Sequence, residues 1–251
     1  MTIKLNINDR AAIAIMNKTK RVEIRTNTAN SKYDFSNLNS GDIIEFNSNN
    51  LGVFYVKVKE INFYKTIEEL LILEGTKYTV SSTNDYNEAI KNIYNLNGYK
   101  DAIKNNGVYA IHIEYLHSKN DVWKELYDCA FNVRSPRELS GMISSGGVGA
   151  AILTKNHNIY TGVCIDTASS LGMCAERNAI ANMITNGENE IEKLVCIDSK
   201  GNIGYPCGVC REYMMQLSKN SRNIEILKDI NSEEIVKLEK LIPNWWGYDR
   251  L

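Results

Sequence analysis

The sequence is poor in proline and histidine, with three of each in 251 residues, and its first 128 residues contain no cysteine. Long apolar runs are absent as well. No stretch approaches the roughly 20 apolar residues of a membrane-spanning helix, and the first residues lack the apolar core of a secretory signal. We therefore expect a cytoplasmic protein that does not associate with a membrane.

An excess of charge of either sign is also lacking. The chain has 29 Lys and Arg against 30 Asp and Glu, a formal net charge of −1. This balance excludes a protein that binds nucleic acid through overall charge, although a local basic patch remains compatible with it. A hydrophobic content of 43% with 24% charged residues is ordinary for a globular protein, and the length suits two domains.

The cysteines divide the chain. In the expected reducing compartment they are thiols or metal ligands rather than disulfides. A short polar stretch, 116–121, is the expected boundary, which gives two α/β domains over residues 1–116 and 121–251. All six cysteines lie in the second one: Cys129, Cys164, Cys174, Cys196, Cys207 and Cys210.

Hydrophobic periodicity and turn residues predict the elements of both halves. In the first half we expect strands over 3–7, 21–25, 42–46, 53–61 and 107–115, with helices over 10–16, 66–73 and 86–94. In the second half we expect helices over 122–132, 174–185 and 207–217 and strands over 148–154, 159–165, 194–198 and 224–228. A last helix is predicted from a cap at 231–232 to Pro243.

Two short segments carry the chemistry, Cys174-Ala175-Glu176-Arg177 and Pro206-Cys207-Gly208-Val209-Cys210. Each is predicted to begin a helix, and a helix N-terminus favours the thiolate form of cysteine. Three thiolates with one open position suit a catalytic zinc ion.

Cys207 and Cys210 alone would fit a redox pair or half of a structural zinc site equally well. The upstream Cys174 followed by Glu176 changes this, because a redox pair needs neither residue and a structural site needs a fourth ligand. The pattern agrees with the deaminase signature, in which a glutamate that does not bind the metal transfers protons. The sequence therefore predicts one Zn²⁺ per chain, held by Cys174, Cys207 and Cys210.

From Val148 to Leu217 the chain resembles the small homotetrameric cytidine deaminases and the related blasticidin-S deaminases. The matching segments are 148–153, 159–162, 174–177, 206–211 and the ending Leu241-Ile242-Pro243. The resemblance implies a three-layer α-β-α domain over 121–251 and a homo-oligomer, either a tetramer or a dimer.

The resemblance also implies a mechanism. A zinc-activated water attacks C4 of a cytosine-like ring, and Glu176 carries protons to ring N3 and to the leaving ammonia. Arg177 stands where the family places a positive charge that offsets the thiolates, although a solvated helix residue is the alternative. Ala175 and Pro206 stand where the family contacts its substrate.

The chain departs from the family at the positions that contact the ribose and the pyrimidine ring of the substrate. Cys164 and Asp166 occupy the positions of the ribose-reading Asn-x-Glu, and Gly146-Gly147 replaces an aromatic residue that packs on the pyrimidine. The expected substrate is cytidine, deoxycytidine or a close analogue, and the alternative is an aminonucleoside antibiotic such as blasticidin S. Trp245 and Trp246 would line a pocket or a subunit interface.

In the first half, Lys20, Glu23 and Arg25 match the G-x-K-x-x-E-x-R pattern of ASCH domains, with Lys18 in place of the glycine. The resemblance implies a small β-barrel with helices, related to PUA-like RNA binders. Binding of RNA or of a modified nucleoside would follow. Some ASCH proteins hydrolyse N4-acetylcytidine with a Lys and a Glu, and Lys20 and Glu74 stand where these are expected.

Two considerations weigh against these roles. Position 23 is a threonine in the acetylcytidine enzymes, and the three charges could equally alternate along a solvated strand. A further rival is an RNA-binding protein with a vestigial deaminase fold, but the three cysteines and Glu176 are all present.

Overall fold

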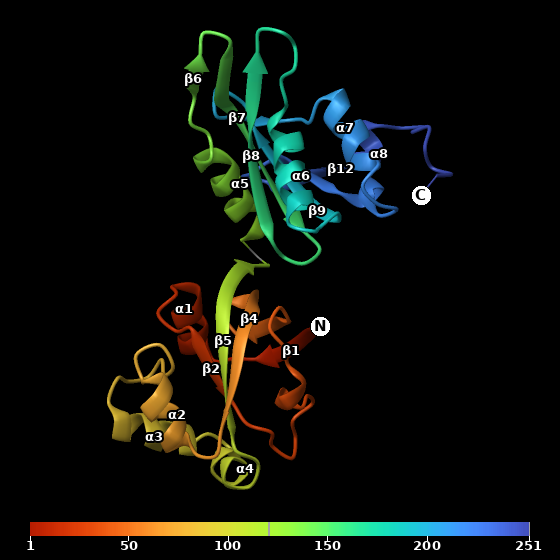
Figure 1. Cartoon of the computed structure of the whole chain (residues 1–251). Helices are drawn as coiled ribbons and strands as arrows, with labels where there is room; N and C mark the ends of the chain where they lie inside the picture. Colours follow the sequence, from red (N-terminus) through yellow and green to blue (C-terminus); the bar gives the residue numbers. More distant parts are fainter. Residues whose placement is uncertain (120, 251) are drawn as a thin grey trace. The chain divides into compact units, whose positions relative to one another are not determined.

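The computed structural model describes residues 1–119 and 121–250. The chain forms two compact units, Met1–Asn120 and Asp121–Leu251, and both mix helices with strands (Figure 1). The predicted α/β class is therefore confirmed. In the described part of the chain, no helix combines the length and apolarity needed to cross a membrane.

The first unit is built around one sheet. Its strands are β1 (Thr2–Asn6), β2 (Val22–Arg25), β3 (Ile43–Ser48), β4 (Gly52–Tyr64) and β5 (Val108–Ser118). Its α-helices are α1 (Asp9–Met16), α2 (Ile67–Glu74), α3 (Tyr86–Tyr94) and α4 (Tyr99–Asn106), and a 3-10 turn, η1, covers Phe35–Asn37. Asn8 caps α1 by accepting a hydrogen bond from the Ala11 amide.

The five strands lie in the order β1-β3-β4-β5-β2, with β1 parallel to β3 and the other pairs antiparallel. Among the described residues no ladder joins β1 to β2, so the sheet is not the closed barrel that we expected. A side chain bridges these two edges instead: Arg25 Nη2 donates to the Asn6 carbonyl over 3.1 Å.

Apolar side chains cover both faces of this sheet, in two separate clusters. One cluster packs α1 and Phe35 on β3 and β4 around Phe46 and Phe54. The other packs α2, α3 and α4 on β2 and β5 around Leu70 and Ile103.

The second unit begins with α5 (Val122–Asn132), as predicted from its apolar spacing. Its strands are β6 (Arg137–Ser140), β7 (Ile143–Thr154), β8 (Ile159–Thr167), β9 (Ile191–Ile197), β10 (Ile203–Gly204), β11 (Glu225–Asp229) and β12 (Glu234–Lys237). Its other helices are α6 (Ala175–Thr185), α7 (Gly208–Met215), the turn η2 (Ser221–Asn223) and α8 (Leu238–Leu241).

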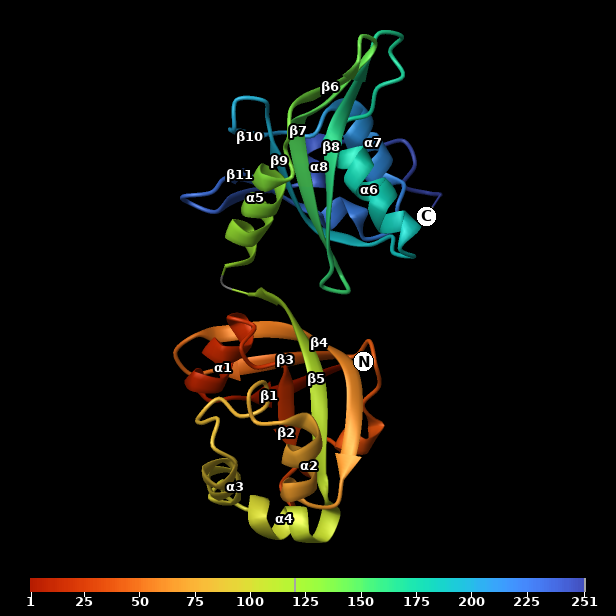
Figure 2. The same ribbon diagram turned by 60° about the vertical axis from the view of Figure 1, so that its left-hand side comes forward.

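The sheet of the second unit is buried on both faces, which explains its continuous apolar strands. Its main path is β12-β11-β9-β7-β6, while β8 also pairs with β7 and β10 pairs with β9. Ala150, Ile152 and Leu194 face α6, α7 and α8, whereas Ala151, Leu153 and Val195 face α5. Helices thus cover both faces of the sheet (Figure 2), and the unit has three layers.

One prediction for the second unit is wrong. The expected last helix is instead the edge strand β12 followed by the one-turn α8, because residues 234–237 pair with β11. The strand β6 was not predicted, because its sequence Arg-Glu-Leu-Ser has no alternation of apolar and polar residues, and all four residues are exposed.

Candidate active site

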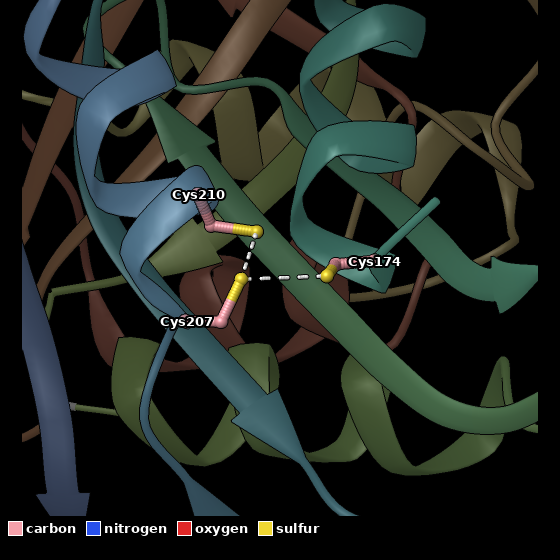
Figure 3. A group of neighbouring side chains, drawn as sticks. All are labelled: Cys174, Cys207 and Cys210. Atoms are coloured by element: carbon pink, nitrogen blue, oxygen red, sulfur yellow. Dashed lines mark hydrogen bonds between the residues drawn. The ribbon is translucent and has the colours of Figure 1, made fainter. Parts of the chain in front are cut away.

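Three cysteine side chains meet where α6 and α7 begin. Cys174 precedes α6, Cys207 precedes α7, and Cys210 lies in the first turn of α7 (Figure 3). Cys207 Sγ lies 3.5 Å from Cys174 Sγ and 3.6 Å from Cys210 Sγ. All three sulfur atoms lie within 4.8 Å of one another, so the predicted metal ligands are brought together.

This arrangement fits a zinc ion. Two thiolates bound tetrahedrally at about 2.3 Å from zinc stand about 3.8 Å apart, close to the spacing here. Cys210 is buried, Cys174 is half-buried and Cys207 is exposed, so one side of the sulfur cluster is open. Three sulfur donors with an open side suit a metal that keeps one position for water or substrate.

The surroundings affect the three thiols differently. Burial raises the pKa of Cys174 and of Cys210, and neighbouring thiols or the Glu176 carboxylate raise them further. Burial also opposes ionisation of Cys207, but hydrogen bonds that include the Cys210 and Val209 amides outweigh it and lower the pKa. Those amides belong to the start of α7, where unpaired N–H groups stabilise a thiolate.

Glu176 is the second residue of α6, two positions after Cys174, and only 5% of it is exposed. A thiol that the sequence did not single out, Cys196 of β9, lies beside it. Burial, with a smaller effect from Glu176, raises the pKa of Cys196 well above its ordinary range. Cys196 therefore stays a neutral thiol next to the carboxylate.

Arg177 is not a fully solvated helix residue. It is half-buried, its Nη2 donates to the Gly172 carbonyl over 3.2 Å, and its buried Nε has no partner among the described residues. It also lines a cavity of about 420 Å³ with Met173, Val209 and Tyr213. No direct contact between Arg177 and a cysteine sulfur is found in the described part of the chain.

The helix that carries Cys174 and Glu176 lies directly on β8. At Gly162 an added Cβ would meet the Ala179 amide nitrogen at 2.3 Å and the Ala175 carbonyl oxygen at 2.5 Å. Only a glycine allows this approach. Ala175 itself is fully buried in the core, so its side chain packs α6 in place, and Pro206 is buried ahead of α7.

The predicted substrate-reading residues form a small group on β7 and β8. The Val148 amide donates to Cys164 Sγ over 3.2 Å, and Cys164 Sγ donates to Asp166 Oδ2 over 3.5 Å. Cys164 is buried and Asp166 is exposed. The ladder is irregular between residues 145 and 149, where Gly146 has φ +85° and its absent Cβ would clash with the Ser135 carbonyl.

The C-terminal tryptophans divide between two environments. Trp245 is buried in the core, whereas 61% of Trp246 is exposed. Both indole N–H groups donate to Glu212, over 2.8 Å and 3.0 Å, and so fix the chain end on α7. Trp245 is therefore a core residue, and the exposed Trp246 is the one that could face a ligand or another subunit.

In the first unit, Lys20, Glu23 and Arg25 form a buried ion-pair chain. Lys20 Nζ lies 3.3 Å from one Glu23 oxygen, and Arg25 Nε donates to the other over 2.9 Å. Burial opposes ionisation of Glu23, but the two cations outweigh it and hold its pKa below the ordinary value. These residues do not alternate along a solvated face. Tyr99, at the start of the unpredicted α4, also bonds Arg25.

The contacts of Glu74 are with a different group of residues from those of Lys20. Its carboxylate accepts hydrogen bonds from Asn62 Nδ2 at 3.0 Å and Tyr64 OH at 2.7 Å, and lies 3.0 Å from His112 Nε2. It is not among the described residues that line the cavity beside Lys20. The strand pairing of β4 with β5 gathers this group, and sequence spacing gave no sign of it.

The family becomes clear when the chain is compared with known proteins. Residues 124–224 match the cytidine and deoxycytidylate deaminase zinc-binding region. A cytidine deaminase of Mycoplasma pneumoniae is 36% identical over 105 residues, which cover 40% of this chain and 79% of that protein. The chain belongs to the cytidine deaminase family. Its second unit is accordingly that of a zinc-dependent hydrolytic deaminase.

Other members of the family are similar over the same part. A blasticidin-S deaminase of Bacillus cereus is 30% identical over 106 residues, 38% of this chain and 74% of that protein. The crystal structure of cytidine deaminase from Mycobacterium tuberculosis has 25% sequence identity and a TM-score of 0.42. That comparison covers 50% of this chain and 97% of that chain.

Proposed function

We propose that the second unit, over residues 121–251, removes the amino group of cytidine, deoxycytidine or a close cytosine-nucleoside analogue and releases ammonia. Cys174, Cys207 and Cys210 would hold one zinc ion per chain. The observation that carries the proposal is the gathering of three sulfur atoms beside the buried carboxylate of Glu176. When bound, zinc supplies Lewis-acid activation of water near neutral pH.

The protein's own residues would supply the proton transfers and the binding. Glu176, held in the first turn of α6, takes a proton from the attacking water and returns protons to ring N3 and to the departing amine. Arg177 would offset the charge of three thiolates, because its half-buried guanidinium has one unpaired N–H. Ala175 and Pro206 would place the ring, through the starts of the two helices that they fix.

The alternative substrate is an aminonucleoside such as blasticidin S. Gly146 and Gly147 stand where the cytidine-type pattern has an aromatic residue, and Cys164 with Asp166 replaces the ribose-reading pair. The Cys164 thiol is held between the Val148 amide and Asp166, so it offers a substrate little of its own hydrogen bonding. The likeness to a blasticidin-S deaminase supports this alternative.

Ammonia release with zinc content measured on the same sample tests the proposal. The substrates would be cytidine, deoxycytidine, N4-acetylcytidine and blasticidin S. We expect turnover that falls by about 10²–10⁴ in Glu176→Ala while about one zinc per chain remains. Glu138→Ala, a change of an exposed glutamate on β6, serves as the control and should keep its activity. Zinc-loaded protein that releases no ammonia from any substrate would contradict the proposal.

We also propose a homo-oligomer, a tetramer or a dimer, and a cytoplasmic location. The exposed Trp246, Val209 and Leu171 support a subunit contact. The described cysteines are free thiols, which suits a reducing compartment. Light scattering of the zinc-loaded protein would test the oligomer, with a monomer at all concentrations as the contradicting result.

For the first unit, over residues 1–116, we propose an ASCH-like module that binds RNA or a modified nucleoside. The chain of Lys20, Glu23 and Arg25 supports it, because two of these charged side chains are buried and the third is half-buried, and burial of charge costs free energy. Hydrolysis of N4-acetylcytidine is the alternative activity. Loss of N4-acetylcytidine binding in Lys20→Ala would support the module, and no binding of it or of RNA by the wild type would contradict it.

A further inference from the structure

A cavity of about 350 Å³ lies beside β2 in the first unit. A second cavity, of about 500 Å³, adjoins it and shares Asn6, Arg25 and Tyr99 with it. Together they occupy the seam where β1 and β2 are joined by the Arg25 side chain and not by a ladder. Such volumes are in the range of small-molecule sites.

Three of the four charged residues at the smaller cavity, Lys20, Glu23 and Arg25, satisfy one another, while the fourth, Arg10, is exposed. Lys20 Nζ donates to the Val22 carbonyl at 2.6 Å and to the Thr79 carbonyl, and pairs with Glu23. Burial lowers the pKa of Lys20, but three acceptors around Nζ favour the ammonium form, since a neutral amine has only two N–H groups. In the ammonium form Lys20 has no lone pair with which to act as a base.

The other two of these charged groups, Glu23 and Arg25, are also hydrogen-bonded within the protein. Glu23 uses its second oxygen for Arg25 Nε, and the Arg25 guanidinium further bonds the Asn6 carbonyl and Tyr99. Its guanidinium lies 5.8 Å from the centre of the Phe46 ring. A phosphate group would need cations with free donors, and Lys20 Nζ together with Arg25 Nε and Nη2 donates to the protein instead.

Hydroxyl and amide groups are what the cavity offers to a ligand. The Thr79 side chain is completely buried, lines the cavity, and its Oγ1 has no hydrogen-bond partner among the described residues. Ser82 accepts one bond from Asn92 Nδ2 at 3.1 Å, which leaves its own hydroxyl proton and the Asn92 carbonyl oxygen available. Ser81 lines the same wall.

Thr79 is the most telling of these groups. A buried hydroxyl without a partner destabilises a fold relative to a methyl group of the same shape, so such groups are rare in folded proteins and need a reason. A hydrogen bond to a bound molecule would supply one.

We propose that this cavity binds an uncharged molecule of nucleoside size that presents both hydrogen-bond donors and acceptors, with the Thr79 hydroxyl as its buried contact. The inference rests on the proposal that the first unit is a binding module. It assigns Lys20, Glu23 and Arg25 to shaping the wall and not to catalysis. The ligand would share the chemistry of the substrate class of the second unit.

Hydrogen–deuterium exchange on the full chain locates the binding. The probes are cytidine, uridine and adenosine at millimolar concentration, with cytidine 5′-monophosphate and a single-stranded RNA oligonucleotide as charged comparisons. We expect a neutral nucleoside to slow exchange in residues 76–82 and 92–99. Protection of these segments only by the charged probes, or by no probe, would overturn the proposal, as would nucleoside protection confined to the second unit.

Variants of Thr79 test the contact. Thr79→Val should weaken nucleoside binding by at least about tenfold, the effect of losing one good hydrogen bond, while its melting temperature stays equal or rises. Thr79→Ser should restore binding. Thr19→Val makes the same change at an exposed threonine outside the cavity and should bind as the wild type does.

Unchanged binding by Thr79→Val would overturn the proposed contact. Ammonia release from cytidine is measured on the same variants and should not change, so a failure here is distinguishable from a failure of the deaminase proposal.

Discussion

At the scale of single residues, Gly162 controls how closely α6 approaches the sheet. Replacement by alanine places a methyl group 2.3 Å from the Ala179 amide nitrogen, which is backbone and cannot swing aside. The helix must shift, and it carries Cys174 and Glu176. A shift of this kind alters both stability and the geometry of the metal site.

We therefore expect Gly162→Ala to lower the free energy of unfolding by about 1–3 kcal/mol, as overpacking does, and to reduce kcat. Urea unfolding and ammonia release measure the two effects. Gly141→Ala is the matched control, because an added Cβ there meets no atom within 4 Å. Equal behaviour of the two variants would contradict the close approach.

A second prediction at the residue scale concerns the stability of the fold at acidic pH. Burial opposes ionisation of Glu74, but hydrogen bonds from Asn62, Tyr64 and His112 outweigh it and hold its pKa below the ordinary 4.5. A carboxyl with a lowered folded-state pKa stabilises the fold above its unfolded pKa. That stability is lost as pH falls through the folded pKa.

Glu74→Gln should consequently lose stability at neutral pH and show a shallower decline between about pH 5 and pH 3 than the wild type. Urea unfolding across this pH range is the measurement. Glu114→Gln, at a surface pair 56% exposed on both sides, should change stability by no more than about 1 kcal/mol. A wild-type slope in Glu74→Gln would show that Glu74 is not the group that titrates.

At the scale of elements, the metal site depends on two helix starts at once. α6 brings Cys174, and α7 brings Cys207 and Cys210. We expect Cys174→Ala and Cys210→Ala each to lower bound zinc below one per chain. Activity should fall by more than about 100-fold, the upper end of what loss of an outer-shell partner causes.

Zinc analysis and ammonia release check this expectation. Cys129→Ala, on α5, is the matched control and should retain both zinc and activity, since Cys129 lies in the cluster on the other face of the sheet. Full zinc in Cys174→Ala would mean that the ion is held elsewhere.

The same scale explains what the sequence could predict. The Cys-x-Glu and Cys-x-x-Cys spacings place their residues at helix starts whatever the tertiary structure, so the cluster was foreseeable. α5 was also foreseeable, from its apolar spacing. Residues 234–241 were not, because Glu, Lys and Leu favour a helix and only pairing with β11 makes part of the segment a strand.

Sequence spacing also could not predict the groups of residues that only the tertiary structure brings together. Glu74, the last residue of α2, meets His112 of β5, 38 positions later, only because α2 packs against β5. Thr79 meets Lys20 through a loop after α2, and the chain gives no local signal of either contact. The open seam between β1 and β2 was equally invisible, since each strand alone looks like a barrel strand.

At the scale of the whole molecule, bound zinc should raise stability, because an ion that binds the folded state more tightly than the unfolded chain shifts the folding equilibrium. We expect a chelator to lower the melting temperature and abolish ammonia release, and added Zn²⁺ to restore both. Calorimetry with and without the chelator measures the shift. No change in melting temperature after demonstrated zinc removal would contradict this prediction.

The sulfur cluster has one more consequence, for the unfolded chain. Cys174 and Cys207 are 33 positions apart, and a single ion bound to both closes the intervening chain into a loop that contains α6 and β9. A closed loop has fewer disordered conformations than an open one, in the way that a disulfide restricts them. Zinc would thus act as a removable cross-link that keeps α6, which contains Glu176, tethered together with β9 even when their packing loosens.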